Sequence, residues 1–186
     1  MCSRNFKLNN KYVILMGYDY LNIFKTIKYN NLENILIIIP KKGDVFSQKN
    51  IDYIKNNTKI NIKKINYKNE EIKKPITSFT TDVLITMSWR TKINTEIIDL
   101  ADLSINIHPA LLPEYKGYHP LPYVLMNNED YHGITAHILE EEIDSGDIMF
   151  KYKYRINKFS TIKSLIDKTK KQMPIFFEKL LKKIEK

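Results

Sequence analysis

Two polar residues that could act on one substrate stand at the end of a short apolar run. The run begins at Leu103, contains Asn106 and His108 with one residue between them, and is ended by Pro109. Alternate side chains of a strand share a face, so this amide and this imidazole are expected to point the same way. Such groups donate hydrogen bonds and transfer protons. We interpret the pair as part of a reactive site, with a structural strand-end histidine as the alternative.

A second stretch could supply a carboxylate to the same site. The run Gly133–Leu139 is an expected strand, and it leads into an acidic loop that contains Asp144 and Gly146. A turn of this composition is by itself typical of structure, because aspartate accepts hydrogen bonds from nearby backbone N–H groups. Its combination with the first stretch favours a functional role. His137, on the expected strand, could support the same network or pack in the core.

The elements that must position these residues follow an α/β rhythm. The expected strands are Tyr12–Met16, Asn34–Ile39, Ile60–Ile65, Asp82–Met87 and Leu103–Ile107. Runs that are apolar on both faces, such as Ile35–Ile39, are typical of a mostly parallel sheet flanked by helices. Ligands of such sheets bind beyond the carboxyl ends of the strands, where Asn106 and His108 are expected.

The pattern changes after the last of these strands. A proline-rich loop is followed by an expected helix, Leu121–Met126, and by two expected strands, Gly133–Leu139 and Ile148–Tyr154. The candidate residues flank this change.

The C-terminal segment is an expected amphipathic helix. Between Thr161 and Ile184, apolar side chains recur at helical spacing with lysines on the other face, which favours packing against the sheet over lying on a membrane. Pro174 predicts a kink or a break into two helices. We expect residues 1–157 to form the catalytic domain and residues 158–186 to form a helical segment packed on it.

Composition limits the classes of function. The 186 residues carry a formal net charge of +9, but only three of the 30 basic residues are arginine, and the lysines are scattered. Without a basic stripe and stacking aromatics, we expect no nucleic-acid partner. The single cysteine gives no sign of an oxidising compartment, and no run suits a signal peptide or a membrane span. We expect a cytoplasmic protein with no membrane partner and no metal, because the histidines lack ligand spacing with cysteines.

Together the two polar stretches resemble the catalytic core of the formyltransferases that use 10-formyltetrahydrofolate. The resemblance rests on motifs in the family's order and approximate spacing, namely Asn106–Pro109, Leu111–Pro113, Gly117, Gly133–His137 and Ile143–Asp147. It covers the middle of the chain, from near Thr81 to Tyr152. It implies a Rossmann-like fold, with Asn106, His108 and Asp144 as the catalytic residues.

These residue types suit the chemistry that the resemblance implies. Attack of an amine on the formyl carbon creates an oxyanion, which Asn106 and a protonated His108 could stabilise. A proton must also pass from the amine to the departing folate nitrogen. Asp144 could orient the imidazole, bias its pKa and relay that proton through water.

The resemblance also implies where the folate binds. In the resembling enzymes the pterin lies between the loop before the catalytic aspartate and the end of the strand that precedes the Asn/His strand, held largely by main-chain groups. The matching residues here are Met87, Trp89, Arg90, Glu140, Glu141, Glu142 and Ile143. The formyl donor would be 10-formyltetrahydrofolate, with no metal or other cofactor.

This sequence differs from two branches of the family, and these differences narrow the range of acceptor amines. Glycinamide ribonucleotide formyltransferases carry a Gly-rich phosphate loop after the first strand, whereas Met16–Leu21 has one glycine and bulky aromatics. Methionyl-tRNA formyltransferases add a C-terminal RNA-binding domain, whereas this sequence ends in one helical segment.

The resemblance is greatest to the nucleotide-sugar N-formyltransferases, at Asp82–Arg90 and Gly117–Tyr123. This branch predicts a nucleotide-sugar substrate, with dTDP-4-amino-4,6-dideoxyglucose as the leading acceptor, in O-antigen or lipopolysaccharide synthesis. Its members are commonly longer, and a homodimer is compatible with the resemblance.

Three alternatives stay open at this point. The chain could be a glycinamide ribonucleotide formyltransferase, or a formyltetrahydrofolate hydrolase that uses water as the nucleophile with the same three residues. It could also be an inactive folate-binding module, although such a module would not require all of Asn106, His108 and Asp144.

Overall fold

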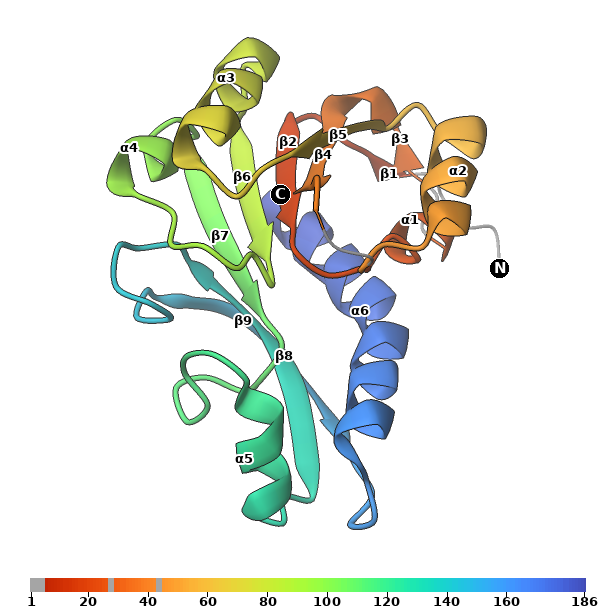
Figure 1. Ribbon diagram of the computed structural model, residues 1–186, viewed down its shortest axis with the longest axis vertical. Coiled ribbons are helices and arrows are strands. Elements are labelled where there is room, and N and C mark those ends of the chain that lie inside the picture. The colour runs from red at the N-terminus through yellow and green to blue at the C-terminus, as the bar shows by residue number, and fades with distance from the viewer. Residues whose placement is uncertain (1–5, 27–28, 43–44) are drawn as a thin grey trace.

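The computed structural model describes residues 6–26, 29–42 and 45–186, and its centre is a seven-stranded sheet (Figure 1). The strand order is β5-β4-β2-β6-β7-β8-β9. The strands are β2 (Tyr12–Met16), β4 (Ile35–Pro40), β5 (Asn61–Ile65), β6 (Val83–Met87), β7 (Leu103–His108), β8 (Tyr131–Ile138) and β9 (Ile148–Arg155). Every strand expected from the sequence is present, with its ends shifted by at most two residues. The short strands β1 (Phe6–Lys7) and β3 (Tyr29–Asn30) pair separately.

The sheet is mostly parallel, as the sequence predicts. β5, β4, β2, β6 and β7 run parallel to one another, whereas β8 is antiparallel to β7, and β9 is antiparallel to β8. All residues of β2, β4 and β6 are buried, because helices cover both faces of these strands. The antiparallel pair extends the sheet where the sequence pattern changes.

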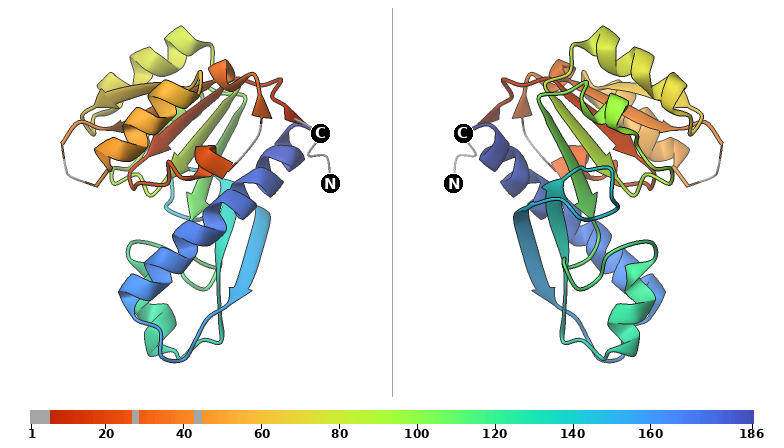
Figure 2. Two further views of the ribbon diagram at one scale, coloured as in Figure 1. Left: turned by 90° about the vertical axis from the view of Figure 1, so that its right-hand side faces the viewer. Right: turned by 90° about the vertical axis from the view of Figure 1, so that its left-hand side faces the viewer.

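Helices divide between the two faces of the sheet. They are α1 (Ile23–Thr26), α2 (Gln48–Asn57), α3 (Asn69–Phe79), α4 (Thr95–Ile98), α5 (Pro120–Met126) and α6 (Ile162–Ile184), with a 3-10 helix, η1 (Leu32–Asn34). Along β2, Ile14 packs in a cluster with α1, α2 and α6, whereas Val13 and Leu15 pack with α3 and α4. Figure 2 shows α6 crossing one side of the sheet and α3 lying on the opposite side.

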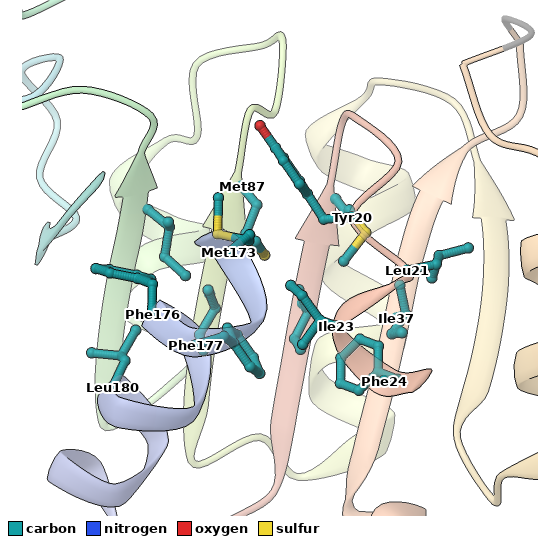
Figure 3. Close-up of a cluster of buried hydrophobic side chains, with 14 of the residues drawn as sticks. Tyr20, Leu21, Ile23, Phe24, Ile37, Met87, Met173, Phe176, Phe177 and Leu180 are labelled. Atoms are coloured by element: carbon teal, nitrogen blue, oxygen red, sulfur yellow. The ribbon is translucent and has the colours of Figure 1, made fainter. Parts of the chain in front are cut away.

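Helix α6 packs its apolar stripe on the sheet, as expected, and its Phe177 ring lies on the side of Phe24 of α1 (Figure 3). Phe177 meets Phe24 edge to face, with ring centroids 5.9 Å apart. Of the kink or break expected at Pro174, the break is wrong, because the helix continues through this residue, and the kink stays a prediction. A proline frees the carbonyl four residues earlier, and here the Asn22 side-chain amide donates to that Lys170 carbonyl at 3.1 Å. Among the described residues, no helix is long and apolar enough to cross a membrane.

The ends of β2 and β6 approach each other too closely for a side chain. The Gly17 N–H donates to the Met87 carbonyl at 2.9 Å, and a Cβ at Gly17 would lie 1.9 Å from the Ser88 carbonyl oxygen. Only glycine permits this backbone approach. It brings the loops that follow β2 and β6 to the same edge of the sheet.

Candidate active site

A cavity of about 520 Å³ opens at the carboxyl ends of β2, β6 and β7, where ligands of such sheets bind. The polar cluster consists of Asn106, His108 and Asp144, which line the cavity, and of His137 behind them. The tyrosine wall consists of Tyr18, Tyr20, Ile162, Ile166 and Thr169, from the loop after β2 and from α6. The loop wall consists of residues 88–93 and of Leu139, Glu140, Glu141 and Ile143.

Asn106 is fixed by hydrogen bonds on both atoms of its amide. The Thr86 hydroxyl donates to Asn106 Oδ1 at 2.7 Å. Asn106 Nδ2 donates to Asp144 Oδ1 at 3.0 Å and lies 3.1 Å from His137 Nε2. Because Oδ1 accepts from Thr86, the donor side of the amide must face the carboxylate.

His108 lies between two oxygen atoms. Its Nδ1 is 3.3 Å from Asp144 Oδ2, and its Nε2 is 2.6 Å from the main-chain carbonyl of Tyr115. The side chain is almost fully buried, and this burial lowers its pKa below the usual value for histidine. The Asp144 carboxylate and the Tyr115 carbonyl act in the opposite direction, since both favour the protonated ring.

Asp144 joins the two stretches that the sequence singles out. Its Oδ2 accepts from the Gly117 N–H at 2.8 Å, while its Oδ1 lies 3.2 Å from His137 Nε2. Burial would raise the pKa of this carboxyl, but hydrogen bonding from His137, the proximity of His108 and the Gly117 N–H together lower it. Asp144 is therefore a carboxylate at neutral pH.

His137 belongs to the polar cluster, which the sequence left open. Its Nδ1 lies 2.8 Å from the Ile138 carbonyl, and its Nε2 faces Asn106 Nδ2 at 3.1 Å and Asp144 Oδ1 at 3.2 Å. Pairing of β7 with β8 sets Asn106 opposite His137, which explains why they share a face.

Three residues around the cavity hold backbone conformations that side chains usually avoid. Ser88, His119 and Asp144 have φ angles of 50°, 57° and 52°. Such left-handed conformations persist in non-glycine residues where the surrounding structure enforces them, and they gather at functional sites.

The residues expected to contact folate fall into two groups. Trp89, Arg90, Glu140, Glu141 and Ile143 line the cavity at the loop wall. Met87 is fully buried in the core beneath it, and Glu142 is exposed and does not line the cavity. Only main-chain atoms could serve at Met87, and folate contact at all seven positions stays a prediction.

The tyrosine wall is a part of the site that the sequence motifs do not predict. Tyr18 and Tyr20 have ring centroids 5.5 Å apart, and Lys170 Nζ lies 4.5 Å from the centroid of Tyr18. Ile166 and Thr169 reach the cavity from α6, nearly 150 residues later in the chain. The helical period marks these α6 residues as core-facing but cannot show that they reach a ligand cavity.

The polar cluster is suited to acyl transfer. It offers an amide donor and an imidazole where a carbonyl oxygen could become an oxyanion, together with an ionised carboxylate that can assist proton transfer. Its groups are held on the ends of paired strands, so little reorganisation is required when charge develops.

The fold and the site thus define an α/β protein with a cavity equipped for acyl transfer. The sequence model that describes formyl transferases matches residues 13–181. The chain belongs to the formyl transferase family.

Three curated relatives illustrate the range of this family. The bifunctional polymyxin resistance protein ArnA of Wigglesworthia glossinidia brevipalpis is 30% identical over 157 residues, covering 84% of this chain and 22% of that protein. A methionyl-tRNA formyltransferase of Thermotoga maritima is 35% identical over 53% of this chain and 33% of its own. A GDP-perosamine N-formyltransferase of Brucella melitensis is 28% identical over 58% of this chain and 42% of its own. The chain spans less than half the length of each.

Solved structures share the Rossmann-like fold. The phosphoribosylglycinamide formyltransferase of Streptococcus pneumoniae superposes with a TM-score of 0.75 at 12% identity, over 94% of this chain and 98% of that one. This likeness confirms the fold expected from the sequence. Within the described ranges, no group of three or more His, Cys, Asp and Glu side chains is arranged to hold a metal.

Proposed function

We propose that the chain transfers a formyl group from 10-formyltetrahydrofolate to the amine of a nucleotide-linked amino sugar. The leading acceptor is dTDP-4-amino-4,6-dideoxyglucose. The product would enter surface polysaccharide synthesis in the cytoplasm, such as that of O-antigen or lipopolysaccharide.

The shape of the cavity supports this pairing of substrates. The polar cluster, the loop wall and the tyrosine wall line the same cavity, so a formyl donor at the loop wall and an amine at the tyrosine wall could meet at Asn106 and His108. The loop wall offers main-chain groups of two loops, which suits a flat heterocycle. Trp89 and Ile143 add apolar surface to that wall.

The contacts of Asp19 are the observation that favours an amino sugar over a ribonucleotide as the acceptor. It is 7% exposed, and its carboxylate accepts from Leu21 N–H at 3.1 Å, from Ser47 N–H at 3.0 Å and from the Asn50 side-chain amide at 2.8 Å. These backbone donors, one of them at the start of α2, are of the kind that would hold a phosphate after the first strand. Because a protein carboxylate already takes them, this loop is poorly suited to the phosphate of a ribonucleotide.

The tyrosine wall supports an amino sugar, and not a ribonucleotide, as the acceptor. The ring of Tyr18 can pack against the apolar face of a hexose, and Lys170, whose Nζ lies 4.5 Å from the centroid of that ring, is a nearby cation that could attract an anionic carrier. A relative that formylates GDP-perosamine, by its name, is consistent with this assignment.

The acceptor is tested by offering four amines with 10-formyltetrahydrofolate. They are dTDP-4-amino-4,6-dideoxyglucose, GDP-perosamine, glycinamide ribonucleotide and methionyl-tRNA, and mass spectrometry detects the gain of CO that formylation produces. We expect product with a nucleotide sugar and much slower reaction with the other two. Preferred formylation of glycinamide ribonucleotide or of methionyl-tRNA would contradict the proposed acceptor while leaving the formyl transfer intact.

A further inference from the structure

The contact between His108 and Tyr115 has a consequence for the state of the imidazole. A carbonyl oxygen can only accept a hydrogen bond, so a separation of 2.6 Å from His108 Nε2 requires a proton on that nitrogen. In the neutral ring, Nδ1 then carries the lone pair. Nδ1 lies on the side of Asp144, with Oδ2 at 3.3 Å, so a proton that arrives there gains a carboxylate partner.

The Tyr115 carbonyl is held by the side chain of the same residue. The Tyr115 hydroxyl donates to Glu129 Oε1 at 2.5 Å and accepts from Asn127 Nδ2 at 3.1 Å. Burial first, and then the hydrogen bond to Glu129, raise the pKa of Tyr115, so the hydroxyl keeps its proton and remains the donor. The residue is also held through its own N–H, which donates to the Leu111 carbonyl at 3.2 Å.

The anchoring residues are themselves fixed at the end of α5. The Asn127 N–H donates to the Tyr123 carbonyl at 2.9 Å, and the Glu129 N–H donates to the Val124 carbonyl at 3.3 Å. The loop between β7 and α5 is thereby tied at its middle to the helix that follows it. Two residues beyond Tyr115, the same loop donates the N–H that Asp144 accepts.

We propose that Tyr115 is a positioning residue, whose hydroxyl, anchored on Glu129, holds its carbonyl against His108 Nε2 and thereby reserves Nδ1 for proton exchange. A neutral imidazole has two tautomers, and the partner of one nitrogen decides which nitrogen is basic. Tyr115 fixes this choice without touching the substrate. The inference rests on the proposed formyl transfer but on no particular acceptor.

Three titratable side chains on neighbouring elements affect the charge of His108. Asp144 lies in the loop after β8, and His137 and His132 lie on β8. Loss of the Tyr115 carbonyl would remove a contact that favours the protonated ring, so the pKa of His108 would fall further. If catalysis needs the basic form of Nδ1, the acid limb of the kcat profile should then move to lower pH.

The test combines nitrogen NMR of the histidine rings with kinetics on the full chain. The variants are Tyr115→Phe, which removes the hydroxyl, Glu129→Ala, which removes its acceptor, and Glu129→Gln, which keeps an acceptor oxygen. Tyr123→Phe, at an exposed tyrosine of α5, is the matched control. The His108 signals are assigned by their loss in His108→Gln.

We expect wild type, Glu129→Gln and Tyr123→Phe to show His108 protonated at Nε2, and Tyr115→Phe and Glu129→Ala to show a mixture of tautomers. kcat should fall about tenfold in these last two variants, with both KM values little changed, as loss of one anchoring hydrogen bond implies. A wild-type proton on Nδ1, or an unchanged tautomer in Tyr115→Phe, would overturn the proposal. The NMR result needs no acceptor, so it stands apart from any failure of the proposed function.

Discussion

The polar cluster and the tyrosine wall face the same cavity but are built in different ways. In the cluster, hydrogen bonds join Asn106 to Asp144 and hold His108 and Asp144 to the backbone, while His108 Nδ1 lies 3.3 Å from Asp144 Oδ2. In the wall, Tyr18 and Tyr20 present rings, and Lys170 makes a cation–π contact. Under the proposed function, we expect the reaction to depend on the hydrogen-bonded polar cluster, and the choice of acceptor to depend on the tyrosine wall, which could change without disturbing the cluster.

The largest expected effect is a loss of kcat when a residue of the polar cluster is replaced. Asn106→Ala removes the proposed oxyanion donor, so kcat should fall about a hundredfold or more. Donor and acceptor affinities should stay close to those of wild type, because the tyrosine wall is untouched. Steady-state kinetics with a binding titration check this, and Asn61→Ala, at an exposed position on β5, is the control. A loss of acceptor affinity as large as the loss of kcat would show that the two regions are not separable.

A second prediction concerns the support behind the tyrosine wall. His132 is buried against Tyr154, whose hydroxyl lies 2.9 Å from the Thr169 hydroxyl. Burial, aided by nearby His108 and partly offset by the Pro109 carbonyl, lowers the pKa of His132 to about 4. Between pH 6.5 and about pH 4, His132 therefore binds a proton in the unfolded chain but not in the folded chain.

The free energy of unfolding should accordingly fall as pH falls from 6.5 to 4, with His132 contributing about 3 kcal/mol across this window. His132→Phe should flatten this dependence, as measured by urea unfolding at a series of pH values. Identical pH slopes for the two proteins would show that His132 is protonated in the folded chain.

The smallest expected effect is a rise in KM when a residue of the tyrosine wall is replaced. Tyr18→Ala should raise KM for the nucleotide sugar about tenfold and leave kcat and KM for the folate nearly unchanged, since only ring packing is lost. Tyr53→Ala is a matched control, because Tyr53 also carries a lysine over its ring but lies on α2 outside the cavity. A drop in kcat without a change in KM would place Tyr18 with the polar cluster.

The polar cluster could be predicted from the sequence because its residues lie in compact local motifs. Asn106 and His108 share a face through strand alternation, and the strand limits around them follow from apolar runs. The structure adds the contacts that make these residues one unit, including the pairing of β7 with β8 that brings His137 beside Asn106.

The tyrosine wall and the Tyr115 anchor could not be predicted in this way. Tyr18 and Lys170 meet only because α6 packs across the sheet, and Asp19 meets Ser47 only because α2 begins nearby. Pro174 shows the same limit, since local chemistry predicts a kink or a break, whereas the helix is continuous and a distant donor, Asn22, satisfies the carbonyl that the proline frees. Such contacts depend on tertiary packing and leave no periodic signal in the sequence.

The most direct test of the central claim, that the polar cluster transfers a formyl group to an amine, compares wild type with His108→Ala. Both proteins are first shown to bind 10-formyltetrahydrofolate, and are then mixed with dTDP-4-amino-4,6-dideoxyglucose and followed by mass spectrometry. We predict a formylated sugar with wild type. With the variant, the rate of formylation should be at least about a hundredfold lower, at unchanged folate affinity. Equal rates for the two proteins, or no transfer to any of the four amines by wild type with folate bound, would contradict the claim.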